Sequence, residues 1–308
     1  MDRGKTRSKD IHDFPVYVIN LKEREDRWKR FKSQPQSATF RNLRRFFAIN
    51  GKKLDYKRDK RVSLRTKLNI TRNYRRSHYE IATLGAVGAS LSHISIWKQF
   101  LESGQPVCMV FEDDVILTDN QIKDIQRLYS ECPSGWGVWL LGCYLPNLII
   151  KPMKGGKWNR VYNFTAAHAY MLTRDAAKAL LEQPYPVETH VEYYMTGVSI
   201  LTDMLIVNTP DVQLEFFHRN HDPRTPESNT SQHKKTGCPV CKIPDDYSQL
   251  YRGYTRKTKR GTNILGIVRG EQPKKILNFA NTKFRGHSRV AKRNKTDVVE
   301  EIKPTVQY

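Results

Sequence analysis

The most constraining feature of this sequence is a short apolar run that ends in three carboxylates. Residues 107–111 read Val-Cys-Met-Val-Phe, and Glu112, Asp113 and Asp114 follow directly. Five consecutive apolar residues predict a β-strand that is buried on both faces, as in the centre of an α/β sheet. Ligands of open α/β sheets bind beyond the carboxyl ends of the strands. The run therefore predicts an acidic site at one edge of a sheet.

The chemistry of this acidic run favours a metal ion. Adjacent carboxylates repel one another, and hard divalent cations prefer oxygen ligands of this kind. Alternation along a strand predicts that Glu112 and Asp114 lie on one side and Asp113 on the other. Such an acidic-x-acidic pair suits Mn²⁺ or Mg²⁺ held against two phosphates. The alternative is a solvated loop in which Asp114 caps the following element.

Strand-like and helix-like segments alternate along most of the chain. Residues 14–21, 137–142 and 166–172 read as strands, and residues 82–103 have the period of a helix. This alternation predicts an α/β fold with a mostly parallel, mixed sheet flanked by helices. Residues 52–80 are basic and weakly periodic, and they are predicted to form an insertion or loop.

Positive charge is concentrated at the two ends of the chain. The formal net charge is +22, with +15 in residues 1–80, −5 in residues 81–233 and +12 in residues 234–308. We expect a flexible basic arm over 1–13, one domain over 14–233 and a basic, partly disordered extension over 234–308. A field of this kind attracts an anionic donor, nucleic acid or an anionic membrane surface.

Cysteine usage and hydropathy bear on location. The chain has five cysteines, no apolar leader at its start and no run as long as a transmembrane helix. We therefore expect reduced thiols in a cytoplasmic protein, with peripheral membrane contact as an option. Cys238 and Cys241 lie near several histidines, but one Cys-x-x-Cys pair is an incomplete zinc pattern, and whether it binds zinc stays open.

Three segments, taken in order, resemble glycosyltransferase family 25, which includes lipooligosaccharide and collagen galactosyltransferases. The likeness covers roughly residues 14–231, and the order of the segments is more specific than any single motif. The chain departs from the family pattern at Ala89, where a cysteine is usual, and at Glu188 or Glu192, where the pattern has Pro-Val-Asp. The three segments are Val18-Ile19-Asn20-Leu21 with Arg24 and Arg27, residues 84–93 followed by Trp97, and Phe111-Glu112-Asp113-Asp114-Val115.

The resemblance implies a GT-A-like (Rossmann-like) fold and an inverting transfer of galactose or glucose. The donor would be UDP-galactose or UDP-glucose, and the acceptor a hydroxyl of a glycan or protein, as in lipopolysaccharide biosynthesis. Glu112 and Asp114 would hold Mn²⁺ or Mg²⁺, with His218 as a further ligand candidate. The residues expected to contact the donor are Asn20, Arg24, Arg27, Ser92, His93 and Asp113.

An inverting transfer also needs a base that accepts the proton of the acceptor hydroxyl. Glu192 is the first candidate and Glu188 the second, because both lie in a tyrosine-rich segment, predicted to be a loop, that could stack on a sugar.

Two other classes of function fit parts of the sequence. One is a nucleic-acid or anionic-surface binding protein built on a degenerate transferase fold, which the basic ends favour. The less favoured one is a glycoside hydrolase, because paired carboxylates also serve that reaction. A hydrolase needs no metal, so inhibition by EDTA distinguishes it from the transferase.

Overall fold

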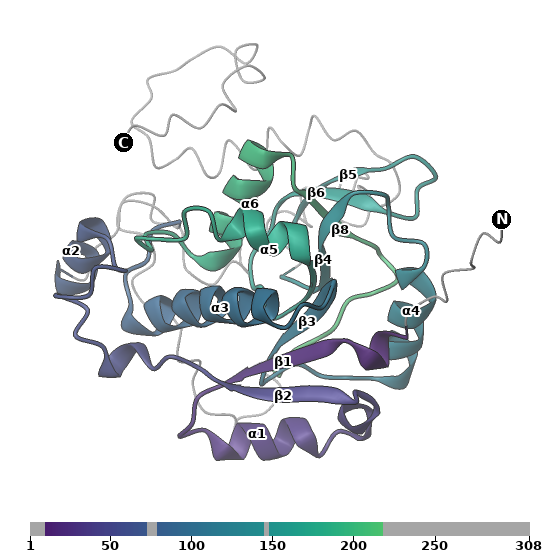
Figure 1. The fold of residues 1–308 in the computed structure, drawn as a ribbon, viewed down its shortest axis with the longest axis horizontal. Helices are drawn as coiled ribbons and strands as arrows, with labels where there is room; N and C mark the ends of the chain where they lie inside the picture. The colour runs from purple at the N-terminus through teal and green to yellow at the C-terminus, as the bar shows by residue number, and fades with distance from the viewer. Residues whose placement is uncertain (1–9, 73–78, 145–147, 218–308) are drawn as a thin grey trace, which may run out of the picture.

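The computed structural model describes residues 10–72, 79–144 and 148–217. Its centre is an eight-stranded sheet with the strand order β2-β1-β3-β7-β4-β8-β6-β5, and helices flank it (Figure 1). The strands are β1 (Pro15–Asn20), β2 (Asn42–Phe47), β3 (Val107–Glu112), β4 (Trp136–Gly142), β5 (Ile149–Pro152), β6 (Asn159–Asn163), β7 (Ala169–Thr173) and β8 (Leu205–Asn208).

The strand directions bring several strand ends to one edge of the sheet. β1 pairs in parallel with β2 and β3, and β4 pairs in parallel with β8. β7 is antiparallel to both β3 and β4, and β6 is antiparallel to β5 and β8. The carboxyl ends of β1, β3 and β4 therefore share an edge with the amino end of β7. The α/β class with a mixed sheet is confirmed, and β6 and β7 are the strands that run against the others.

Local sequence signals explain where the helices begin. Thr83, Thr118 and Thr173 are N-cap residues whose hydroxyls accept hydrogen bonds from the backbone N–H groups three residues later. Threonine is a favoured N-cap because it satisfies an amide that has no partner within the helix. The α-helices are α1 (Glu25–Lys32), α2 (Leu64–Arg72), α3 (Leu84–Glu102), α4 (Asp119–Tyr129), α5 (Arg174–Leu180) and α6 (Val191–Thr202), with 3-10 helices η1 (Ile11–Asp13), η2 (Pro35–Thr39) and η3 (Gly51–Lys53).

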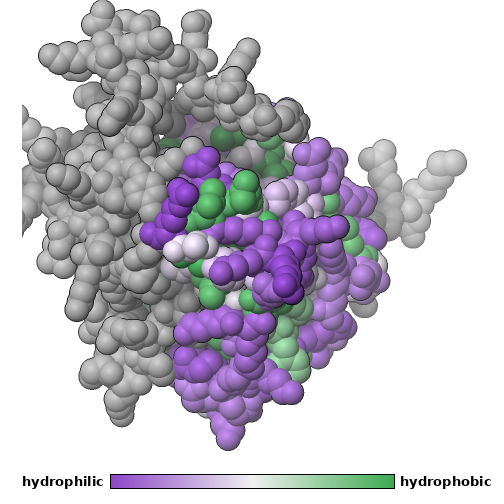
Figure 2. Space-filling view, turned by 90° about the vertical axis from the view of Figure 1, so that its left-hand side faces the viewer, coloured by the Kyte–Doolittle hydropathy of each residue, from purple (hydrophilic) through white to green (hydrophobic). Residues whose placement is uncertain are grey.

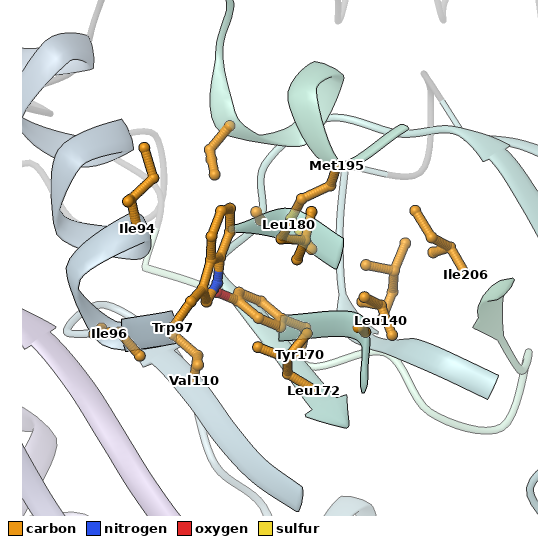
Figure 3. Close-up of a cluster of buried hydrophobic side chains, with 14 of the residues drawn as sticks. Ile94, Ile96, Trp97, Val110, Leu140, Tyr170, Leu172, Leu180, Met195 and Ile206 are labelled. Carbon is orange, nitrogen blue, oxygen red and sulfur yellow. The ribbon is translucent and has the colours of Figure 1, made fainter. Parts of the chain in front are cut away.

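The apolar run of β3 is buried on both faces, as its sequence predicts. Cys108 and Val110 pack into the core under α3, α5 and α6, whereas Met109 and Phe111 pack into the core under α1 and α4. Figure 3 shows the first of these cores, where Trp97 of α3 points its ring nitrogen at the hydroxyl of Tyr170 in β7. The sheet is thus fixed between two apolar layers, and its polar edge is held rigidly.

The structure differs from the sequence-based expectations in three segments. Ile11, assigned to the arm, is fully buried within η1, so packing begins before residue 14. Residues 64–72, assigned to a basic loop, form α2. The segment that contains Glu192, expected to be a tyrosine-rich loop, begins α6 instead. In the last two cases side chains on the inner face pack against the rest of the fold and stabilise the helix: Thr66 and Asn69 are buried in α2, and Val191 and Met195 are buried in α6.

Several expectations fall on other parts of the chain. His218, Cys238, Cys241 and the extension over 234–308 lie outside the described residues. Cys108, Cys132 and Cys143 are free thiols, and burial raises the pKa of Cys143 to about 12. Within the described residues, no helix has the length and apolar character needed to cross a membrane.

A close backbone contact between α3 and the loop after β2 shapes the polar edge. A Cβ on Gly88 would lie 2.3 Å from the carbonyl oxygen of Ile49 and 2.7 Å from the amide nitrogen of Gly51. We expect Gly88→Ala to lower the free energy of unfolding by about 1–3 kcal/mol, since backbone must move to admit the methyl group.

The matched change is Gly197→Ala in α6, where a Cβ would meet no atom within 4 Å. It should raise the free energy of unfolding by about 0.5–1 kcal/mol through helix propensity. Urea denaturation measures both values, and equal effects at the two sites would contradict the tight contact at Gly88.

Candidate active site

The acidic run ends at the shared edge of the sheet, beside a cavity of about 240 Å³. β3 ends at Glu112, and Asp113 and Asp114 lie in the turn that follows. The cavity is lined by these three carboxylates, by the segment after β1, by the segment from Ala48 to Lys52, and by the first half of α3. Its lining includes the expected residues Arg24, Arg27, Ser92, His93, Glu112, Asp113 and Asp114.

Arg27 joins the two aspartates, which corrects the expectation from strand alternation. Its Nη2 atom lies 2.6 Å from Asp113 Oδ1 and 2.6 Å from Asp114 Oδ2. Asp113 and Asp114 therefore do not lie on opposite sides. Alternation applies only within a strand, and both residues follow the last residue of β3. Glu112 is the separate member of the run, and its carboxylate faces α3.

Asn20, at the carboxyl end of β1, fixes the position of Asp113. The side-chain amide of Asn20 donates a hydrogen bond to Asp113 Oδ2 at 2.5 Å and another to the carbonyl oxygen of Arg24 at 3.0 Å. Its own amide oxygen accepts from Arg45 Nε at 2.9 Å. Every polar atom of the Asn20 side chain thus contacts protein, which makes it a residue that positions Asp113.

The three carboxyl groups have different proton affinities. Burial raises the pKa of Asp113 to about 6, against the opposing charge of Arg27. Burial and the charge of Glu112 raise the pKa of Asp114. Burial also acts to raise the pKa of Glu112, but the interactions of its carboxylate with His93, His168 and Arg27 outweigh it, and the net pKa is lowered. Glu112 is therefore the most readily ionised carboxyl of the three.

His93 is held by a chain of buried ring groups. Its Nδ1 atom lies 2.9 Å from the hydroxyl of Tyr170, which also accepts a hydrogen bond from Trp97 Nε1 at 2.9 Å. The Tyr170 hydroxyl hydrogen finds its acceptor at Nδ1, so Nε2 carries the histidine proton. Nε2 lies 3.8 Å from Glu112 Oε1. His93 thus presents a donor to the carboxylate at the cavity wall.

Two other residues expected to contact the sugar donor also have partners within the protein. The Ser92 hydroxyl accepts from the amide of Ile49 at 2.8 Å and donates to the carbonyl oxygen of Gly88 at 2.6 Å, so it ties α3 to the loop after β2. Arg24 lines the cavity but donates two hydrogen bonds to Asp26. Any contact of these residues with a donor remains a prediction.

Glu192, in the first turn of α6, lies near the acidic edge. Burial, together with the charge of Glu112, raises the pKa of Glu192 to about 7, and the backbone N–H groups of Glu192 and Ala166, which interact with the carboxylate, act in the opposite direction. Ala166 has a φ of 61°, in a left-handed region that alanine rarely adopts. Such strain often marks a functional site. Glu188, in contrast, lines a second cavity beneath α3 with Trp97 and Tyr194. The structure thus separates the two base candidates.

His168 is a residue of this site that the sequence does not reveal. Its Nε2 atom lies 2.8 Å from the carbonyl oxygen of Leu214, and its Nδ1 atom is buried without a hydrogen-bond partner. The carbonyl oxygen of His168 accepts from the amide of Glu112 at 2.7 Å. A Cβ on Gly142 would lie 2.3 Å from His168 Nε2, so the site requires glycine there. The only sequence signal is a polar residue within the apolar run that ends in β7.

The geometry of the acidic edge limits how a metal ion could be held there. Among the described residues, no three His, Cys, Asp or Glu side chains are arranged to hold a metal ion. Asp114 Oδ1, however, is buried and has no hydrogen-bond partner. Mg²⁺ commonly binds proteins through only one or two carboxylates and takes its other ligands from water and substrate phosphates. Glu112 and Asp114 fit a site of that kind, in which a diphosphate supplies the rest.

Comparison with known proteins assigns the family. A model of glycosyltransferase family 25, described as an LPS biosynthesis protein, matches residues 13–195. The chain belongs to glycosyltransferase family 25. The matched range contains β1, α3, the acidic run and Glu192, and so it includes every described residue assigned above to the site except the segment around Leu214.

Individual relatives match shorter stretches. Procollagen galactosyltransferase 1-A of Xenopus laevis is 32% identical over 100 residues, which are 32% of this chain and 16% of the relative. The probable inactive glycosyltransferase 25 family member 3 of Rattus norvegicus is 45% identical over 49 residues, which are 16% of this chain and 9% of the relative. The chain thus spans less than a fifth of the length of these curated relatives.

Solved structures show only distant similarity. Mouse xyloside xylosyltransferase 1, in its apo form, aligns with a TM-score of 0.35 and 10% identity, covering 63% of this chain and 84% of that one. Apo UDP-glucose pyrophosphorylase aligns with a TM-score of 0.33 and 11% identity, covering 66% and 74%.

Proposed function

We propose that this family 25 glycosyltransferase moves galactose or glucose from a UDP-sugar to a hydroxyl of a glycan or protein acceptor, with inversion and with a divalent metal. The observation that carries the proposal is the cavity at the sheet edge, where Glu112, Asp113 and Asp114 face Arg24 and Arg27. Cations and ionised carboxylates around one cavity suit a metal-bound diphosphate better than a neutral ligand.

The basic residues of the cavity would bind the donor. Arg24, Arg27 and Lys52 line it from two segments of the chain, so a diphosphate between them would meet positive charge from two sides. Arg27 contacts Asp113 and Asp114 through one terminal nitrogen, and an arginine has further N–H groups that can bind phosphate oxygens. Mn²⁺ or Mg²⁺, held by Glu112 and Asp114, would neutralise the charge that develops on the leaving diphosphate.

Glu192 would act as the base. An acceptor hydroxyl gives up its proton as it attacks the sugar carbon, and a carboxylate with a pKa near the working pH is an effective acceptor for that proton. The pKa of Glu192, raised to about 7 by burial, satisfies this requirement. The Ala166 N–H holds the carboxylate in place. Tyr193, the next residue along α6, packs edge-on against Tyr79, with ring centroids 4.5 Å apart.

Release of UDP tests the proposal directly. The full chain should release UDP from UDP-galactose or UDP-glucose in the presence of Mn²⁺ and an acceptor, and EDTA should abolish the release. Activity that survives EDTA would favour a metal-free reaction such as glycoside hydrolysis. No UDP release across the common UDP-sugars, together with no binding of those sugars by calorimetry, would contradict the proposal.

A further inference from the structure

The orientation of α2 is unusual for a helix on a protein surface. Leu64 and Leu68, one turn apart, are 73% and 38% exposed, whereas Thr66 and Asn69 are almost fully buried. A surface helix normally buries its apolar stripe and exposes its polar residues. In α2, Ile70 packs against the core, but the two leucines lie on the outer side of the helix.

Hydrogen bonds fix α2 in this orientation. The Thr66 hydroxyl donates to the carbonyl oxygen of Val187 at 3.1 Å. The side-chain amide of Asn69 donates to Glu80 Oε2 at 3.1 Å and to the carbonyl oxygen of Ile81 at 3.2 Å. Rotating the helix to bury the leucines would break these bonds and leave buried polar groups without partners, which is costly. The exposed leucines are therefore a stable feature of the fold.

The surroundings of the leucines are strongly basic. Residues 52–72 contain nine Lys or Arg and two Asp, and each Asp is paired, with Arg58 or with Arg61. By helical periodicity, Lys67 lies on one side of the Leu64–Leu68 stripe, and Arg65 and Arg72 lie on the other. None of these three cations forms an ion pair with another described residue. Figure 2, seen from the side on which α2 lies in Figure 1, shows hydrophobic side chains within a largely hydrophilic surface.

We propose that α2 docks this protein on an anionic lipid bilayer. Exposed apolar side chains framed by cations are the pattern of helices that lie in a membrane interface. The leucines enter the acyl boundary, and the long Lys and Arg side chains reach the negative headgroups. Phosphates of a nucleic acid would interact with the cations but would gain nothing from the leucines, and so the bilayer fits both features.

The position of α2 connects this surface to the proposed active site. The basic segment starts at Lys52, which lines the acidic cavity, and α2 is bonded to the residues just before α6. The basic segment that leads to α2 therefore begins at the wall of the cavity. The proposal does not depend on catalysis, since vesicle binding is measured without any sugar donor.

Vesicle cosedimentation of the full chain tests the proposal. The wild-type protein should bind vesicles of phosphatidylcholine and phosphatidylglycerol, and bind phosphatidylcholine alone at least about tenfold more weakly. Replacing both leucines, Leu64→Gln with Leu68→Gln, leaves every charge in place and should lower binding to the anionic vesicles about tenfold or more.

The matched control is Ile200→Gln with Leu201→Gln, at the end of α6. These residues are 40% and 64% exposed, and no Lys or Arg occurs in α6. This variant should bind the anionic vesicles within about twofold of wild type, and both variants should keep the wild-type melting temperature. Full vesicle binding by the Leu64 and Leu68 variant would overturn the proposal. Equal binding of the wild-type protein to neutral and anionic vesicles would also overturn it. The same holds if the Leu64 and Leu68 variant loses self-association but binds vesicles as the wild type does.

Discussion

Replacing Glu192 with glutamine is expected to lower kcat for sugar transfer by about 10²- to 10⁴-fold, the usual contribution of a general base. Glutamine has the shape of the glutamate and can still accept a hydrogen bond from the Ala166 N–H through its amide oxygen. It cannot accept the proton of the acceptor hydroxyl. The KM for the donor should change by less than about threefold, because Glu192 does not line the cavity assigned to the donor. UDP release measured over a range of donor concentrations at saturating acceptor gives both quantities.

The pH dependence of kcat gives a second test of the same residue. Burial raises the pKa of Glu192 from 4.5 to about 7. Only the ionised form can accept a proton, so kcat should rise about tenfold per pH unit below pH 7 and level off above it. This rising limb should be absent from the residual activity of Glu192→Gln. A wild-type profile that is flat between pH 5.5 and 8, values chosen to bracket that pKa, would contradict the assignment.

Glu188→Gln is the matched control, because it makes the same chemical change in the neighbouring segment. Glu188 lines the second cavity together with Ile94 and Trp97 of α3, and it does not line the acidic one. The kcat of the Glu188→Gln variant should remain within about threefold of the wild-type value. A large loss of kcat in Glu188→Gln, with Glu192→Gln active, would exchange the roles of the two residues.

Replacing Asp114 with asparagine should lower kcat/KM by about 10³-fold. The change removes one of two carboxylates that fit a divalent cation, and loss of one strong electrostatic contact in an active site costs about 10²- to 10³-fold or more. The fold should be preserved. The raised pKa of Asp114 means that its native surroundings disfavour the charged carboxylate relative to water. A neutral residue of the same shape therefore does not lower stability through lost charge.

The control for Asp114 is Asp119→Asn, an exposed residue in the first turn of α4 outside the cavity. It loses the same charge and should keep kcat/KM within about twofold. UDP release gives the activities, and thermal unfolding confirms that both variants are folded. Wild-type activity in a folded Asp114→Asn protein would remove this carboxylate from the proposed mechanism.

Much of the fold follows from local patterns that the sequence displays. Alternate residues of β3 point to opposite faces of the sheet, and both sets are apolar and buried. This pattern is needed only in a strand that lies between two layers. Residues 84–102 form a helix because Thr83 caps it and apolar residues recur along it. Other segments show no local pattern that predicts their structure. In α2, two polar residues, Thr66 and Asn69, face the rest of the fold beside Ile70, while two leucines face outward, so the segment gives no ordinary amphipathic signal.

The candidate site, too, could be predicted from the sequence only in part. The sequence shows that Glu112, Asp113 and Asp114 follow a buried strand. It also shows that Asn20 and Arg27 lie at or after the end of another. That Arg27 bridges two aspartates 86 and 87 residues away depends on β1 lying beside β3. Tertiary contacts also separate the base candidates, because Glu188 lines the second cavity whereas Glu192 lies near Glu112. His168 reaches the site because β7 enters the sheet in the opposite direction.

By itself, the sequence determined the chemical elements of this protein: the family, the α/β class, the acidic run at a strand end and the basic segment after β2. Tertiary structure alone decided which of these side chains meet, which of two glutamates lies near Glu112, and that α2 turns its leucines outward. The physical reason is the distance along the chain over which each effect acts. Burial periodicity and capping act within a few residues of the chain, whereas strand order and helix packing join residues that are far apart in sequence.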